Sequence, residues 1–206
     1  MKVELEQWRY LKMLKVKNIQ VFNFDRALFS ARNPLNSWDK SSPEANLDLA
    51  RRLYKAGPEH RKYLRQIMIC CDILAPLYWW KEFDTYKVGT TANSCSTMHT
   101  LHKRALMLED FSTENIVDDY KSTFEDYITL LNVLRLCYVE TKDKQMWYTI
   151  IQMLPSSFNQ LRTVTMNYEN LVNIIHQRSH HKLDEWHQFI DALRTGTNIN
   201  EIIGND

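Results

Sequence analysis

Helix-length apolar periodicity dominates the chain from Leu101 onward, and no other feature limits the choice of fold as much. FEDYITLLNVLRLCYVET and DKQMWYTIIQMLP carry apolar residues at helical spacing, and Pro155 ends the second segment. A last helix is predicted over HHKLDEWHQFIDALR, with Gly196 as its C-cap. The stretch around HTLHKRALMLEDF is also interpreted as helical, with Ser112 after it as a capping candidate. The C-terminal half is therefore expected to be rich in helices.

The first hundred residues predict a different mixture. VEL and IQVF, within residues 1–23, indicate two short strands joined by a polar link. Ser42 as N-cap and Pro43 at the first helical position begin a helix that stops at Gly57. IMICCDILAPLYWW fits a buried strand or a core helix equally well, and the polar stretch KEFDTYKVGTTANSCSTMH reads as a loop. Together these segments predict an α+β fold: a single domain over residues 1–206 with a small mixed or antiparallel sheet.

Composition narrows the function classes. The 206 residues are 44% hydrophobic and 25% charged, with only four Gly and five Pro, which fits one globular core and not a turn-rich β protein. A net charge of +1 gives no field that would favour nucleic acid or a membrane surface. The N-terminus, MKVELEQWRYLK, does not resemble a signal peptide, and no stretch approaches 18 apolar residues. We therefore expect a cytoplasmic protein with free thiols that binds neither nucleic acid nor membranes.

Metal and thiol chemistry are weakly supported. His176 and His180 have an i, i+4 ligand spacing, but the sequence lacks HExxH and a paired zinc spacing of cysteines, so no metal site is expected. Cys95 precedes His99 by four residues, and a Cys–His nucleophile would need the two side chains to be adjacent in space. A small residue in a polar loop is the favoured interpretation of Cys95.

The segment Asn159–Arg178, NQLRTVTMNYENLVNIIHQR, offers a more specific hypothesis. It is predicted to form one amphipathic helix with Asn167 and Arg178 about three turns, or roughly 16 Å, apart near one line. An amide and a guanidinium so placed could hold two ends of an elongated anion, because the planar fork of Arg donates paired hydrogen bonds to phosphate. Taken alone, each residue also fits a bland role: a solvated polar side chain, or an Arg that complements the helix dipole.

The chain from Gln152 to Trp186 resembles the C-terminal part of flavin-dependent thymidylate synthases. In that family a Leu-Pro is followed by a hydroxyl-rich helix, an Asn, a Leu-rich turn and an Arg eleven residues after the Asn. Leu154-Pro155, Asn167, Leu171 and Arg178 fit this order. GPEH, ending at His60, is similar to a Pro-x-Glu-His element of the family, and the apolar run IMICCDILAPLYWWKEFD is similar to the segment that precedes the family signature.

The signature itself, Arg-His-Arg-x-x-Ser-x-Asn-Glu-x-Ser-x-Arg-Tyr, aligns with YKVGTTANSCSTMH, and here the chain departs from the pattern. Asn93 and Ser96 match, and Thr91 keeps a hydroxyl. Other family residues are replaced, at Tyr86, Lys87, Val88, Ser94, Met98 and His99. The lost arginines would each remove charge-assisted bonds of roughly 1.5–3 kcal/mol to flavin and nucleotide phosphates. The cations available to compensate for the lost positive charge are Lys87, Lys81, Arg162 and Arg65.

The resemblance implies an FAD-dependent methyltransferase that converts dUMP to dTMP, with methylenetetrahydrofolate and NADPH as co-substrates, in a homotetramer whose subunits share the sites. It places Arg178 and Ser96 at dUMP as catalytic and substrate-binding residues, with Arg162 as a further substrate ligand. The residues it implies for FAD are His60, Lys87, Thr91, Asn93 and Asn167. Two alternatives stay open: a divergent phage-type relative that binds or modifies another pyrimidine nucleotide, and a non-catalytic nucleotide-binding or structural homologue.

Overall fold

The computed structural model describes residues 14–204, which form two compact units. Within the described residues, the first unit comprises residue 14, residues 74–84 and residues 94–162, and the second comprises residues 15–73, 85–93 and 163–204. The single-domain organisation expected from the sequence therefore stays a prediction. Among the described residues, no helix combines the length and the apolar character needed to cross a membrane.

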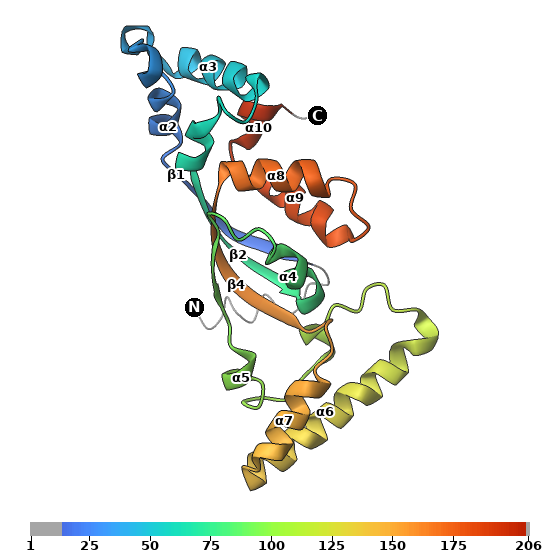
Figure 1. Cartoon of the computed structure of the whole chain (residues 1–206). Helices are drawn as coiled ribbons and strands as arrows, with labels where there is room; N and C mark the ends of the chain where they lie inside the picture. The colour runs from blue at the N-terminus through green and yellow to red at the C-terminus, as the bar shows by residue number, and fades with distance from the viewer. Residues whose placement is uncertain (1–13, 205–206) are drawn as a thin grey trace. The chain divides into compact units, whose positions relative to one another are not determined.

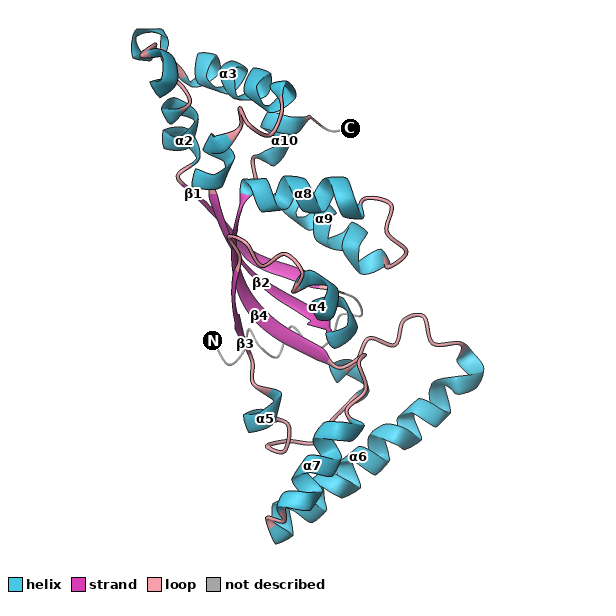
Figure 2. Cartoon of the chain, viewed as in Figure 1, coloured by secondary structure: helices cyan, strands magenta, loops and turns pink. Residues whose placement is uncertain are grey.

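A four-stranded sheet supplies the frame of the fold (Figure 2). Its order is β1 (Lys15–Phe22), β2 (Met68–Pro76), β4 (Asn159–Asn167) and β3 (Thr91–Ser94). Backbone bonds from Tyr168 to Ile67 and from Leu77 to Phe158 fix an antiparallel register between β2 and β4. The small antiparallel sheet and helix-rich C-terminal half predicted from the sequence are thus confirmed, and the fold is α+β.

In the second unit, α9 (Asp184–Gly196) packs against β1 and α8 (Tyr168–Arg178) packs against α9, while the other helices lie beyond one end of the strands (Figure 1). These other helices are α2 (Phe24–Ser30), α3 (Pro43–Ala56) and α10 (Ile199–Ile203), with 3₁₀ turns η1 (Asn33–Leu35), η2 (Trp38–Lys40) and η3 (Lys62–Gln66). As predicted, α3 begins at Ser42, whose hydroxyl accepts a bond from the Ala45 N–H, and it ends at Gly57. A Cβ at Gly196 would lie 2.3 Å from Ile19 Cδ1, so a glycine lets α9 approach β1.

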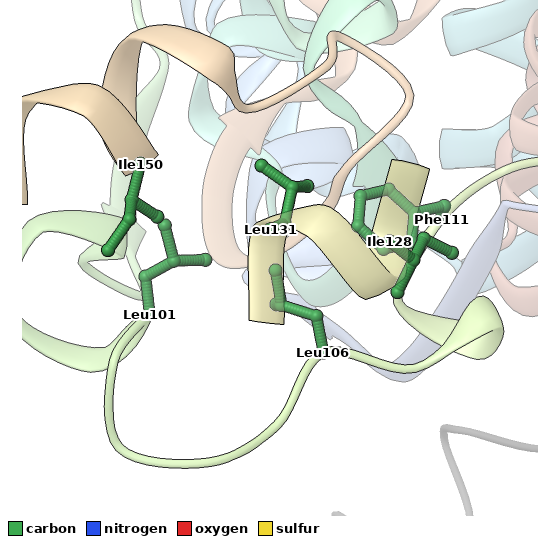
Figure 3. Packing of buried hydrophobic residues seen from close by; sticks show 6 residues of the cluster. All are labelled: Leu101, Leu106, Phe111, Ile128, Leu131 and Ile150. Atoms are coloured by element: carbon green, nitrogen blue, oxygen red, sulfur yellow. The ribbon is translucent and has the colours of Figure 1, made fainter. Parts of the chain in front are cut away.

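The first unit contains α4 (Leu77–Phe83), α5 (Thr97–Thr100), α6 (Lys121–Thr141) and α7 (Lys144–Met153), with η4 (Leu108–Asp110) and η5 (Asp118–Tyr120). α6 and α7, both predicted, pack against each other. Leu131 and Ile128 of α6, Ile150 of α7 and three residues before α6 form a buried cluster (Figure 3). The three are Leu101, Leu106 and Phe111.

Four secondary-structure expectations change. The stretch KEFDTYKVGTTANSCSTMH, interpreted as a loop, contains strand β3 and most of α5. The predicted helix over residues 159–178 is wrong in its first half, which is strand β4. The β-branched run Thr163–Thr165 favours a strand, and Val164 and Met166 are buried at a spacing of two residues. HTLHKRALMLEDF holds only the end of α5, turns and η4, and Ser112 caps no helix there but donates to Asn159. The run IMICCDILAPLYWW, which fitted either a strand or a helix, forms strand β2 and then the start of helix α4. The VEL strand lies outside the described residues.

Asparagine occupies three positions with a left-handed backbone: one within β1, one before α2 and one after η1. Asn18, Asn23 and Asn36 have φ values of 52°, 66° and 48°, the left-handed region that most residues avoid. Asn18 and Asn23 also use their side-chain amides, which donate to Asp72 and to the Gln66 carbonyl. Asn is among the few non-glycine residues that visit this region readily, so the backbone adopts these conformations with little strain.

Candidate functional site

Helix α8 begins at one predicted site residue and ends at another. Asn167 is its N-cap: the side-chain oxygen accepts from the Asn170 N–H at 3.0 Å, and Asn170 returns a bond to the Asn167 N–H. Arg178 is the last residue of the helix. The sequence predicted both residues within one helix, and the structure places Arg178 there, but Asn167 caps the helix and does not lie within it.

The segment 85–90, which contains the start of the altered signature, is bonded to both ends of α8. At the N-terminal end, the Asn170 side chain donates to the Val88 carbonyl at 2.7 Å. Gly89 has φ +74°, and a Cβ there would lie 2.6 Å from Asn167 Nδ2, so only glycine fits this approach. At the C-terminal end, the Tyr86 hydroxyl donates to Gln177 Oε1 at 3.0 Å. These contacts hold Lys87 on a segment that is fixed on both sides.

Arg178 lies against two aromatic rings. Its guanidinium carbon is 5.7 Å from the Tyr86 ring centre and 4.9 Å from that of Trp186, and its Nε–H donates to the Tyr86 hydroxyl at 3.0 Å. The two rings meet edge to face at 6.0 Å. Arg178 is therefore oriented by its neighbours and does more than complement the helix dipole. Its role toward a nucleotide stays a prediction.

The remaining flavin residues implied by the sequence belong to the same unit and are exposed. They are His60, Lys87, Thr91 and Asn93. Thr91 and Asn93 are two apart on β3, an edge strand, so their side chains project from one face of the strand. Thr90 adds a hydroxyl that is buried and has no hydrogen-bond partner among the described residues. This stretch is rich in hydroxyl and amide groups and has one flexible cation, Lys87.

Ser96 and Arg162 belong to the other unit. Ser96 is the N-cap residue of the short α5, and its side chain makes no capping bond. Arg162 is already engaged: it pairs with Asp84 at 2.8 Å, donates to Gln160 and stacks 4.2 Å from the Trp80 ring centre. The acid partially neutralises Arg162, which makes it a weaker phosphate ligand than its sequence position suggests.

Cys95 and the histidines show no sign of catalysis or metal binding. Burial raises the pKa of the Cys95 thiol, which disfavours the thiolate needed for nucleophilic attack. His176 accepts or donates a bond at 3.0 Å to the Tyr54 hydroxyl. Within residues 14–204, no three His, Cys, Asp or Glu side chains gather in a way that could hold a metal ion.

Comparison with known proteins gives a fold. No protein-family model matches the chain, and no curated sequence matches it significantly. The flavin-dependent thymidylate synthase ThyX of Helicobacter pylori, solved with FAD and dUMP, superimposes with a TM-score of 0.72 at 17% identity, over 94% of this chain and 98% of that one. This chain has the flavin-dependent thymidylate synthase fold.

A second structure of the Helicobacter enzyme with the same ligands gives a TM-score of 0.73 at 17% identity, over 95% of this chain and 98% of that one. The UMP/dUMP methylase PolB of Streptomyces cacaoi, bound to 5-Br dUMP, gives 0.65 at 13% identity, over 93% and 92%. The resemblance found in the sequence is therefore confirmed at the level of the fold, with the low identity of a divergent member.

Several residues around α8 were not anticipated from the sequence. Tyr86 was noted only as a replacement of an arginine, yet it orients Arg178. Arg61, directly after GPEH, forms a buried ion pair with Glu169 in the first turn of α8, at 3.0 Å. The six Trp and ten Tyr hinted at aromatic contacts, but no sequence spacing links Tyr86 to Trp186.

Proposed function

We propose that this chain is an FAD-dependent methyltransferase of the thymidylate synthase type, which methylates dUMP to dTMP with methylenetetrahydrofolate and NADPH. The observation that carries the proposal is the fold: over nine-tenths of the chain superimposes on an enzyme solved with FAD and dUMP. The H. pylori enzyme was solved with dUMP and the S. cacaoi UMP/dUMP methylase with 5-Br dUMP, which supports a pyrimidine nucleotide as the substrate class.

The residues present fit FAD by their chemistry. A dinucleotide offers a diphosphate and ribityl and ribose hydroxyls, which bind hydroxyl, amide and ammonium groups. Thr91, Asn93 and Lys87 supply such groups in an exposed stretch, and the unpartnered Thr90 hydroxyl adds a buried one. When bound, the flavin would supply hydride transfer, which no protein side chain provides.

The protein's own part is to bind and orient. Arg178, held by Tyr86, would fix the nucleotide, and Ser96 would donate a hydroxyl hydrogen bond to it, with Arg162 in a lesser role. Asn167 would act by keeping the segment 85–90 on α8, since a cap residue that also contacts Gly89 sets the path of Lys87. We expect a cytoplasmic homotetramer, because the family's sites are shared between subunits.

Absorption spectroscopy tests the proposal directly. Purified protein should bind FAD with a shifted flavin spectrum, and dUMP should change that spectrum further. A ligand that binds only the native state at ten times its Kd stabilises it by about 1.4 kcal/mol, so FAD should also raise the Tm. An unchanged Tm and spectrum at saturating FAD would refute the flavin assignment.

A divergent pyrimidine-modifying enzyme is the second candidate. The S. cacaoi structure, a UMP/dUMP methylase, and the loss of the signature arginines favour it. Growth of a thymidine-requiring bacterium on this gene would support the synthase, whereas flavin binding with a preference for UMP over dUMP would support the second candidate. Absence of both flavin and nucleotide binding would indicate a non-catalytic homologue.

A further inference from the structure

A cavity of about 630 Å³ in the second unit has no role so far. It lies among the end of α2, the turns η1 and η2, helix α3 and the turn η3, and we call it the Arg32 cavity. Its volume is in the range of small-molecule sites. Among the flavin residues implied by the sequence, only His60 lines it.

Arg32 is the unusual member of the lining. It is only 6% exposed, and its recorded hydrogen bonds go to neutral acceptors, Asn46 Oδ1 and the Ser37 carbonyl. No carboxylate among the described residues pairs with it. A buried cation is costly unless an anion compensates it, so the cavity lacks a negative charge that its own residues do not supply.

Most of the other charged side chains that line the cavity are also positive. Lys40, Arg52 and Lys62 add three cations, against the single carboxylate of Glu59. Arg52 is exposed and forms an ion pair with Asp48 at 3.1 Å, so it contributes least to the positive charge of the cavity. The whole chain has a net charge of only +1, and this cluster is therefore a local concentration of positive charge.

Apolar groups complete the cavity. Leu49 and Leu53 of α3 and Pro34 of η1 line it, and Leu35 at its rim is 84% exposed. A large apolar side chain left in water is stabilised when a ligand covers it. Arg32 donates hydrogen bonds to Asn46 of α3 and to the Ser37 carbonyl between η1 and η2. These bonds connect the turns to α3, so the wall of the cavity is ordered.

We propose that the Arg32 cavity binds an organic anion with an apolar or aromatic body and a phosphate or carboxylate group, the anionic group lying at Arg32. The binding of such an anion goes beyond the proposed function. That the anion is a co-substrate rests on the proposed function: the hydride donor carries phosphates and the one-carbon donor carries carboxylates, and both have flat rings.

Calorimetric titration with NADP⁺, folinic acid and inorganic phosphate separates the sources. We expect NADP⁺ or folinic acid to bind, with phosphate binding more weakly because it lacks the ring. Arg32→Gln should weaken binding by about tenfold or more, since it removes a charged donor. Lys62→Gln should weaken binding by a smaller factor without lowering Tm, because the Lys62 side chain makes no hydrogen bond or ion pair with the described residues. Lys55→Gln, an exposed α3 cation outside the cavity, is the matched control and should change nothing.

The outcomes are distinct. Failure of all three probes to bind, or equal affinities in wild type, Lys62→Gln and Lys55→Gln, would overturn the proposal even if Arg32→Gln does not fold. Displacement of the bound probe by FAD, with the same sensitivity to Lys62→Gln, would overturn the co-substrate assignment. Binding of NADP⁺ or folinic acid without any dUMP binding would support the Arg32 cavity as an anion site and refute the proposed thymidylate synthase function.

Discussion

Arg178→Ala should separate the ligand role of this residue from its structural role. The substitution removes two cation–π contacts of about 0.5–1 kcal/mol each at a partly exposed site, and one hydrogen bond of about 0.5–1.5 kcal/mol. Unfolding free energy should therefore fall by about 1.5–3.5 kcal/mol, which for a chain of this size lowers Tm by about 3–14 °C. The variant should still fold, since marginal stability is about 5–15 kcal/mol.

Affinity for dUMP should fall by more than this packing loss explains. Losing a charged donor to the ligand costs about 1.5–3 kcal/mol, or roughly 10- to 150-fold in Kd. Arg178→Lys should recover only part of the affinity, because an ammonium keeps the charge above the rings but not the paired donors. Tyr86→Phe keeps both rings but removes the hydroxyl that accepts from Arg178, so it should weaken dUMP binding by a smaller factor.

Calorimetric titration of each variant measures its affinity for dUMP, and a thermal melt of the same sample measures its Tm. Lys142→Ala is the control, because it removes a cation 5.8 Å from the Tyr138 ring centre in the other unit and should leave dUMP binding intact. Equal dUMP affinities in wild type, Arg178→Ala and Arg178→Lys would refute the assignment. A lowered Tm with unchanged affinity would show that Arg178 only supports the fold.

Three further predictions concern stability. Gly89→Ala should cost more than about 1 kcal/mol and weaken FAD binding, because its Cβ would meet Asn167 at 2.6 Å in a left-handed backbone; urea unfolding and a flavin titration check it, and wild-type behaviour would refute it. Leu131→Ala should cost about 2–5 kcal/mol in the cluster of Figure 3, and a loss below about 1 kcal/mol by urea unfolding would mean that the cluster is loosely packed. Burial raises the pKa of Cys71 to about 12 and that of Tyr168 to about 12, so both keep their protons in the folded state at pH values where the unfolded chain loses them. The free energy of unfolding should be highest below about pH 9 and fall toward pH 12, by up to about 1.4 kcal/mol per pH unit for each group. Cys71→Ala should reduce this slope. A free energy of unfolding that stays constant from pH 8 to 11 would contradict the prediction.

The sequence predicted the elements whose signal is local. Ser42, Pro43 and Gly57 delimit α3 because capping depends on neighbouring residues, and α6 and α7 follow from apolar periodicity. Strand β4 was missed because Leu161, Val164 and Leu171 also satisfy helical spacing, and pairing with β2 decided between the two periods. The run from β2 into α4 is apolar almost throughout, so the sequence carries no periodicity that could locate the change from strand to helix, although the burial of β2 alternates in the structure.

The candidate site was predictable to a smaller extent. Asn167 and Arg178 were found at the two ends of α8 because a family pattern fixes their spacing. The contacts that orient them come from Tyr86, Gly89 and Trp186, between 8 and 92 positions away, and only the fold brings these together. Arg32 drew no attention in the sequence, because an unpaired buried cation is a property of three-dimensional surroundings.

The asparagines with a left-handed backbone have a consequence for the unfolded chain. Asn18, Asn23 and Asn36 take positions that glycine commonly fills, and the protein has only four glycines in 206 residues. A glycine makes the denatured chain more flexible, and replacing one at a compatible turn changes the entropy of unfolding by about 0.4–1 kcal/mol at room temperature. By accepting a left-handed backbone at asparagine, this chain limits the disorder that folding must overcome, and the side chains of Asn18 and Asn23 also donate hydrogen bonds in the native state, which a glycine could not do.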